Sequence, residues 1–396
     1  MRPIRYGVFG AGRGQFFMKP FLWELGFQLR AVCDRNEARL REVLRQYPGT
    51  AVYTDFDDFL AADMDVVILC NYFDEHAPYA IRAMRNGKHV ISETLPAVHM
   101  DELAELVRTV RQTGKIYMLA EDYPYIAYNQ EMARIYRSGE IGEALYAYAQ
   151  YNNTISPEDM ARISNPDHWK NRLAPAYYLT HALAPLLRIT GLRPVTVSAA
   201  SIAAGRGDLL RGTAAAGDPG FSMRLQMENG AIFCVMGLNL PGHCIWYNIH
   251  GTRGAMENER TTGAEYPESY WGSGCVRIWH DAHNCGAFPK ERRYAPAFAE
   301  YPELAAQSDQ GGGELYVMLD FRRAFLEGKQ PEMDIVRAAS LAAAGILGWR
   351  SCLENGRQIA LPDFTNLESL EQFAGDCRSP FSKDPAFRLS ASTREN

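Results

Sequence analysis

The sequence predicts an α/β domain built on a doubly wound parallel sheet, followed by an α+β domain with a large, open, mainly antiparallel sheet. The first 120 residues alternate apolar strand patterns with helical patterns, which favours parallel strands joined by helices. From Tyr123 onward, strand-like segments separated by turns replace this alternation. A chain of 396 residues exceeds the size at which one core stops growing, so we place the two domains at 1–122 and 123–396.

The first strand pattern, Ile4 to Phe9, ends in a glycine-rich turn that leads into an apolar helical pattern. Such a turn brings the backbone close to a pyrophosphate at a helix N-terminus, although Gln15 stands where a third glycine is usual. Asp34 ends the next strand pattern, where an acid binds the adenosine ribose. These features predict a dinucleotide-binding Rossmann domain. Its turn would supply cofactor contacts from Gly10, Ala11, Gly12, Arg13, Gly14 and Gln15.

The remaining elements of the first domain follow in order. Helices are expected at 36–47, 77–86 and 100–112, and strands at 65–70, 88–92 and 116–120. Asn71 and Glu93 come directly after two of these strands. Parallel sheets bind ligands at the carboxyl ends of their strands, so we interpret both residues as contacts to the nicotinamide ribose.

The second domain begins with a helical pattern at 129–138 that ends at Gly139. Strands are then expected at 145–151, 195–201, 221–227, 231–238, 245–250 and 275–279, with helices from about His181 and at 335–353. Thr180 is placed to cap the helix that starts near it. A histidine at a helix N-terminus feels a positive dipole and stays neutral, so His181 could accept a proton.

Composition excludes several classes of function. The net charge is −6 and no block of Lys or Arg occurs, so nucleic acid is not an expected partner. No apolar run is long enough for a membrane span, and a strand starting at Ile4 leaves no room for a leader, so we expect a cytoplasmic protein with reduced cysteines. His280–Cys285 lacks the spacing of a known zinc site, and we predict no metal.

Three stretches of the first domain together resemble the Gfo/Idh/MocA family, of glucose–fructose oxidoreductase and inositol dehydrogenase type. They are the glycine-rich turn, the run 66–71 followed by His76, and the run 87–93. The resemblance covers nearly the whole chain and implies a homo-oligomer, dimer or tetramer. Asp34 favours NAD, while Arg35 beside it keeps NADP as the alternative. The family's Glu-Lys-Pro lysine, which helps deprotonate the substrate, is replaced by Thr94, whose hydroxyl cannot act as a base near neutral pH.

A second departure points to one branch of that family. The stretch 177–185 has Tyr177 where ordinary members carry aspartate, and it resembles the NAD-dependent glycosidase branch of α-N-acetylgalactosaminidase type. That branch also lacks the lysine. The resemblance implies His181, Tyr178 and Tyr125 as catalytic residues, with Tyr123 as the alternative to Tyr125. The stretch 168–172 resembles a substrate-binding segment, which implies sugar contacts from Trp169, Lys170 and Arg172; a solvated charge cluster is the alternative.

Three functions are compatible with these residues. The first is a NAD-dependent enzyme that oxidises a sugar or glycoside transiently and cleaves it by elimination and water addition. The second is a conventional sugar or polyol dehydrogenase in which another residue replaces the lysine. The third is a cofactor-binding sensor without catalysis, against which the pair Tyr178 and His181 argues, because a sensor needs no acid–base group.

Overall fold

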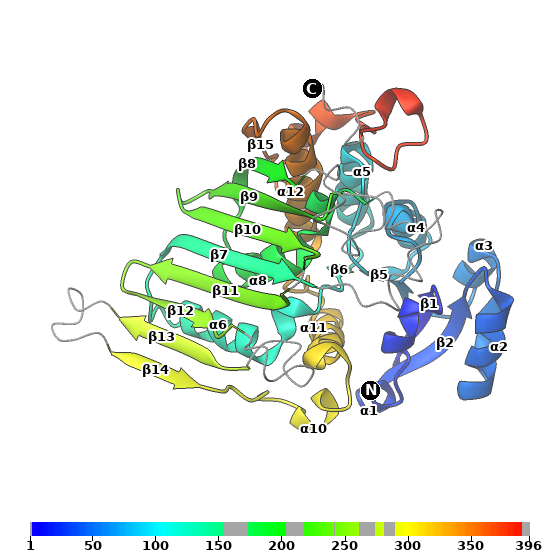
Figure 1. The fold of residues 1–396 in the computed structure, drawn as a ribbon. Coiled ribbons are helices and arrows are strands. Elements are labelled where there is room, and N and C mark those ends of the chain that lie inside the picture. The colour runs from blue at the N-terminus through cyan, green and yellow to red at the C-terminus, as the bar shows by residue number, and fades with distance from the viewer. Residues whose placement is uncertain are drawn as a thin grey trace. The chain divides into compact units, whose positions relative to one another are not determined.

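The computed structural model describes residues 2–153, 173–202, 218–240, 242–260, 274–280 and 290–389. It divides into two compact units (Figure 1). The first unit contains Met1–Asp122, Glu303–Ala339 and Phe364–Asp376, and the second contains Tyr123–Pro302, Ser340–Asp363 and Cys377–Asn396. The predicted fold class, a parallel α/β domain followed by a mainly antiparallel α+β domain, is confirmed.

The first unit is built on a six-stranded parallel sheet in the order β3-β2-β1-β4-β5-β6. Its strands are β1 (Ile4–Phe9), β2 (Phe27–Cys33), β3 (Ala51–Tyr53), β4 (Val66–Leu69), β5 (His89–Ser92) and β6 (Tyr117–Leu119). All four residues of β4 are buried, as the continuous apolar run predicts for a strand covered on both faces. The order reverses beside β1, and sheets of this kind bind ligands at the carboxyl ends of the strands where the order reverses, here β1 and β4.

The helices that connect these strands begin and end where local chemistry allows. They are η1 (Arg13–Phe17), α1 (Phe21–Glu24), α2 (Glu37–Gln46), α3 (Phe56–Leu60), η2 (Phe73–Glu75), α4 (His76–Arg85) and α5 (Met100–Thr113). The Asn36 side chain accepts the backbone N–H groups of Ala38 and Arg39 and so caps α2. Gly114 ends α5 in the left-handed conformation, which a residue with a Cβ adopts at a cost.

Two later segments return to the first unit, although both fall within the range 123–396 expected for the second domain. The first carries α10 (Pro302–Ala305), η7 (Gln310–Gly312) and α11 (Gly313–Glu327), and the second carries η8 (Glu368–Phe373). The backbone N–H of Leu119 in β6 donates to Met333, and Arg111 donates to the carbonyl oxygens of Phe364 and Thr365. These hydrogen bonds attach both segments to the sheet domain.

The second unit is built on a nine-stranded sheet in the order β14-β13-β12-β11-β7-β10-β9-β8-β15. Its strands are β7 (Ala144–Asn152), β8 (Pro194–Ser201), β9 (Gly220–Met227), β10 (Ile232–Leu238), β11 (Cys244–Gly251), β12 (Gly254–Asn258), β13 (Val276–His280), β14 (Glu291–Tyr294) and β15 (Ile359–Ala360). Only the pair β7 and β10 is parallel among the pairs described.

Helices cover one face of this sheet (Figure 1). They are α6 (Ala127–Arg137), α8 (Thr180–Thr190), which follows the short helix η5 (Pro175–Tyr178), and the part of α12 (Ile335–Leu353) that begins at Ser340. Burial alternates along β9 and β10, as expected of strands with one covered face. The helix α12 packs closely, because a Cβ built on Gly348 would lie 2.4 Å from the Met223 methyl carbon.

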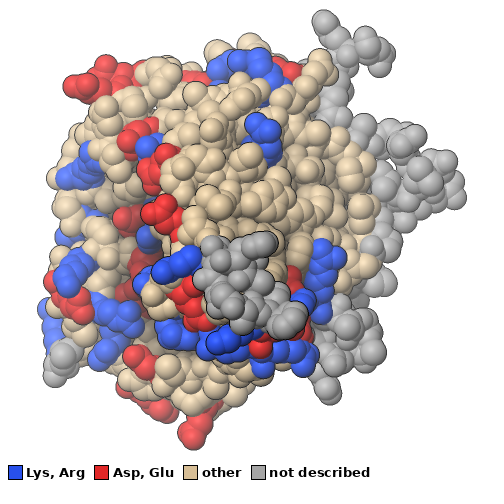
Figure 2. Space-filling view, turned by 90° about the vertical axis from the view of Figure 1, so that its left-hand side faces the viewer, with Lys and Arg blue, Asp and Glu red and all other residues tan. Residues whose placement is uncertain are grey.

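Charged residues of both signs are interspersed over the face shown in Figure 2 and form no continuous basic area there. Within the described parts of the chain, no helix combines the length and the apolar character that a membrane span requires.

Candidate active site

The glycine-rich turn after β1 has the geometry of a phosphate cradle. Gly10 has a φ of +100°, and a Cβ built there would lie 2.4 Å from the carbonyl oxygen of Cys70, at the end of β4. Gly12 precedes η1 and therefore sits at a helix N-terminus. A turn this tight, with backbone N–H groups at a helix start, fits the pyrophosphate of a dinucleotide.

The close-packing glycine of the turn is Gly14. A Cβ at that position would lie 2.3 Å from Cγ1 of Val8, so the first turn of η1 can approach β1 only without a side chain there. Gln15, in contrast, is exposed. The missing third glycine is thus compensated one residue earlier, at Gly14, which serves helix–strand packing.

Asp34 is held rigidly at the end of β2. Its carboxylate is buried and accepts the N–H of Ala11 at 2.7 Å and the N–H of Asn36 at 2.8 Å. Each carboxylate oxygen keeps a further lone pair, which a ribose hydroxyl could use. Arg35, next to it, points elsewhere: its guanidinium donates to the Glu75 carboxylate at 3.1 Å and to the Tyr79 hydroxyl at 3.1 Å.

Three buried polar atoms lie on residues that follow β4 and β5. They are Oδ1 of Asn71, Nε2 of His76 and Oγ1 of Thr94, and none has a hydrogen-bond partner among the described residues. His76 is fixed through Nδ1, which lies 2.7 Å from the Leu95 carbonyl oxygen, and burial lowers the pKa of its imidazole. Buried polar groups normally have partners, so these atoms fit a ligand that would satisfy them.

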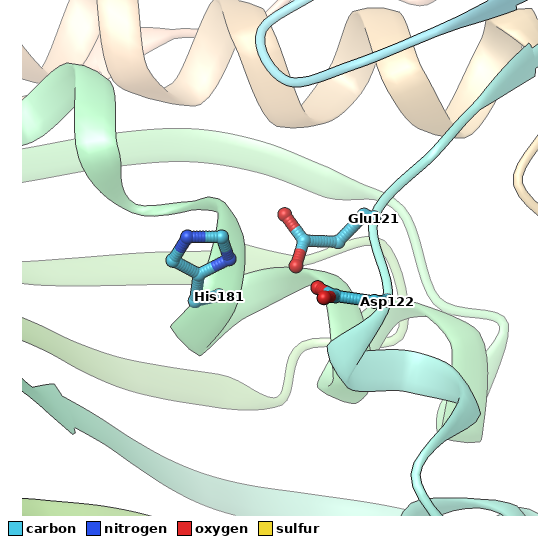
Figure 3. Close-up of side chains that lie close together, drawn as sticks. All are labelled: Glu121, Asp122 and His181. Carbon is cyan, nitrogen blue, oxygen red and sulfur yellow. The ribbon is translucent and has the colours of Figure 1, made fainter. Parts of the chain in front are cut away.

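Arg13 connects the glycine-rich turn to a group of buried acids in the first unit. Its Nε donates to Glu93 at 2.5 Å, while Nη2 lies 3.8 Å from Asp122 and 4.0 Å from Glu314. Asp122 and its neighbour Glu121 extend from the segment that follows β6 (Figure 3). Sequence reasoning assigned no role to Asp122 or Glu314, because only the fold brings α11 to this turn.

The candidate catalytic histidine lies in the second unit, in the first turn of α8 (Figure 3). Three tyrosine rings surround His181: Tyr123 at 4.6 Å, Tyr151 at 4.7 Å and Tyr178 at 4.9 Å between ring centroids. The Tyr247 hydroxyl donates to the backbone carbonyl oxygen of His181 at 2.6 Å and fixes this turn. His181 as a whole is 9% exposed and therefore largely buried.

The helix start differs from the expected cap. Leu179 occupies the N-cap position without a side-chain hydrogen bond, and Thr180 is already the first helical residue. The expectation that Thr180 caps α8 is therefore wrong. Its hydroxyl is buried and has no hydrogen-bond partner within the described parts of the chain. Short helix η5 runs directly into α8, which removes the extended backbone that a capping residue normally adopts.

The structure distinguishes the two tyrosines that follow β6. The ring of Tyr123 lies against His181, whereas the ring of Tyr125 lies beneath the guanidinium of Arg188 at 4.5 Å. Tyr151 in β7 joins the His181 cluster, and sequence reasoning missed it because a strand tyrosine carries no distinctive pattern. Trp169, Lys170 and Arg172 lie outside the described residues, as does most of the stretch from His280 to Cys285.

Known proteins resemble this chain in sequence and in fold. The family model of the Gfo/Idh/MocA oxidoreductases, an NAD-binding Rossmann fold, matches residues 4–121. A glycosyl hydrolase family 109 protein of Saccharopolyspora erythraea is 26% identical over 91% of this chain and 83% of its own length. The α-N-acetylgalactosaminidase of Shewanella oneidensis is 25% identical over 92% of this chain and 86% of its own length.

Among solved structures, levoglucosan dehydrogenase in complex with NADH and levoglucosan matches with a TM-score of 0.73 at 17% identity, covering 91% of this chain and 100% of that chain. At 17% identity, this match shows a shared fold and no more. Together these comparisons confirm the resemblance drawn from the glycine-rich turn and from the stretch around His181.

Proposed function

We propose that this chain is a NAD-dependent enzyme that cleaves a glycoside through transient oxidation of the sugar. Residues 4–121 match the family model of the NAD-binding Gfo/Idh/MocA oxidoreductases. The observation that carries the proposal is the cluster of three tyrosines around His181. It supplies acid–base groups in a chain that has Thr94 where the family lysine stands. The relatives named as glycosidases support the same reaction class.

The proposed reaction uses the bound cofactor for hydride transfer and side chains of the protein for proton transfer. NAD, when bound, would accept a hydride from the sugar and later return it. His181 would take the proton of the hydroxyl that is oxidised, since imidazole is basic near neutral pH. The resulting ketone at the sugar 3-position acidifies the hydrogen on carbon 2. A base removes that proton, the glycosidic oxygen leaves, and water adds in its place.

The tyrosines would serve the elimination step. The rings of Tyr123 and Tyr178 both contact the His181 ring, so either hydroxyl could exchange a proton with the sugar near the imidazole. The contact between Tyr123 and His181 supports Tyr123 as the proton-transfer residue in preference to Tyr125, whose ring lies against the Arg188 guanidinium. Ordinary glycosidases need two carboxylates around the scissile bond, whereas this route needs none.

The test is to incubate the protein with a panel of aryl glycosides and free sugars while following phenol release and NADH absorbance in the same cuvette. We expect phenol without accumulating NADH. The alternative function, a conventional sugar dehydrogenase, is favoured by the fold shared with levoglucosan dehydrogenase, and it would give one NADH for each sugar oxidised.

We also propose NAD rather than NADP as the cofactor. Asp34 places a buried carboxylate where the adenosine ribose binds, and Glu75 holds Arg35 away from a 2′-phosphate. Replacing Glu75 by Gln should free Arg35 and tighten NADP binding about fivefold, because an exposed ion pair contributes up to about 1 kcal/mol. NAD affinity should change less than about twofold on the same scale.

Titration of both cofactors by fluorescence tests the role of Glu75. The matched control is Glu42→Gln on the exposed side of α2, where Glu42 pairs with Arg45. It should alter neither affinity. A wild-type protein that already binds NADP as tightly as NAD would contradict the proposed preference.

A further inference from the structure

Three polar side chains of the first unit lie together at the carboxyl ends of β4 and β5. These two strands pair in parallel with Leu69 opposite Ser92, and Asn71 and Thr94 each follow that pair by two residues. The imidazole of His76, the first residue of α4, reaches the same place, because its Nδ1 lies 2.7 Å from the carbonyl oxygen of the residue after Thr94.

Each of the three side chains presents one defined kind of hydrogen-bonding atom. Burial lowers the pKa of the His76 imidazole, and its Nδ1 must donate to the Leu95 carbonyl oxygen, so the neutral ring carries a lone pair on Nε2. The Asn71 amide nitrogen donates to the Tyr72 carbonyl oxygen at 3.5 Å, which leaves Oδ1 as an acceptor. The Thr94 hydroxyl can donate. The group therefore offers two acceptors and one donor, and none of these atoms has a partner among the described residues.

A primary carboxamide is the hydrogen-bonding complement of this group. Its nitrogen carries two N–H donors and its oxygen accepts, which matches two acceptors and one hydroxyl donor. The glycine-rich turn lies beside the group, since a Cβ built on Gly10 would lie 2.8 Å from the backbone nitrogen of Asn71. A dinucleotide whose pyrophosphate occupies that turn extends its nicotinamide half, which carries a carboxamide, along the carboxyl ends of β4 and β5.

We propose that Asn71, His76 and Thr94 bind the nicotinamide carboxamide and thereby fix the rotation of the ring about its glycosidic bond. The inference rests on NAD binding, one part of the proposed function. Asn71 and His76 accept the two N–H groups, and Thr94 donates to the carbonyl oxygen. A ring held at three points presents a single face to the sugar. The hydroxyl that stands in place of the family lysine therefore orients the cofactor and takes no part in proton transfer.

The analogue 3-acetylpyridine adenine dinucleotide tests the two acceptors, because it carries a methyl group where NAD⁺ carries the amide nitrogen. Asn71 and His76 would face that methyl group and remain unpaired in the complex. Wild-type protein should bind the analogue about 25-fold more weakly than NAD⁺, since each hydrogen bond lost at a buried group lowers the affinity about fivefold.

Calorimetric titration gives the dissociation constants of both dinucleotides in wild type and in three variants. Asn71→Leu and His76→Asn each remove one acceptor, and an asparagine at position 76 keeps a donor for the Leu95 carbonyl oxygen. Each variant should reduce the preference for NAD⁺ over the analogue about fivefold. Thr94→Val removes the donor to the carbonyl oxygen that both dinucleotides share, so both should bind about fivefold more weakly with their ratio unchanged.

The matched control is Thr109→Val, because the Thr109 hydroxyl in the second half of α5 is also buried without a partner among the described residues. It should change neither dissociation constant. Two results would overturn the inference. One is a wild-type protein that binds both dinucleotides within about twofold of each other. The other is a wild-type ratio in both N71L and H76N, which would indicate that water occupies the group.

Either result can occur in a protein that still binds NAD and releases phenol from a glycoside. Failure of the inference is therefore distinguishable from failure of the proposed function.

Discussion

Replacement of His181 by Ala should lower kcat about 10³-fold, the loss expected when a positioned general base is removed. The imidazole lies in the first turn of α8, enclosed by the rings of Tyr123, Tyr151 and Tyr178. No other histidine contacts these three rings among the described residues. The dissociation constant of NAD should stay within about twofold, because the glycine-rich turn and Asp34 belong to the other unit.

Steady-state kinetics and a cofactor titration on the same preparation test this prediction. The matched control is His250→Ala, which removes an exposed histidine from β11 in the same unit. It should retain wild-type kcat. Activity near the wild-type level in H181A would remove His181 from the proposed mechanism, and loss of NAD binding in H181A would indicate a structural role instead.

Replacement of Gly10 by Ala should abolish measurable NAD binding and destabilise the protein by about 2–4 kcal/mol. The backbone of Gly10 has a φ of +100°, which is unfavourable for any residue with a Cβ. The added methyl would also lie 2.4 Å from the Cys70 carbonyl oxygen, so the turn and the end of β4 would have to separate. That movement would open the backbone cradle that the pyrophosphate needs.

The control for Gly10→Ala is Gly49→Ala. Gly49 has a φ of +91°, but a Cβ there would meet nothing within 4 Å. It should cost about 1 kcal/mol from the backbone alone and leave NAD binding unchanged. Thermal unfolding and cofactor titration separate the two effects. Equal losses of stability in both variants, with NAD binding retained in G10A, would contradict a crowded cradle at Gly10.

The first domain was largely predictable because its signals are local. A glycine-rich turn, a buried strand and a glycine helix stop can each be recognised within about ten residues, and β4 and α5 formed as their patterns indicate. The helix expected at 335–353 has those same bounds in α12. The packing role of Gly14 was not predicted, because it depends on the distance to Val8 rather than on spacing along the chain.

The missed parts of the candidate site depend on contacts between distant segments. Glu314 reaches Arg13 only after about 300 residues of intervening chain have folded, and no periodicity in the sequence reports that return. Tyr151 is one of many strand tyrosines until β7 is placed beside α8. The Gly311–Gly313 run was the available signal, since consecutive glycines before a helix indicate a close backbone approach.

The central claim is that oxidation of the sugar is transient, and simultaneous recording of phenol release and NADH absorbance tests it most directly. Aryl glycosides and free sugars are each incubated with the purified protein, with and without added NAD. We expect many turnovers of phenol release without net NADH. Stoichiometric NADH from a free sugar, with no phenol from any glycoside, would contradict it and indicate a dehydrogenase, while silence in both channels with NAD still bound would indicate a sensor.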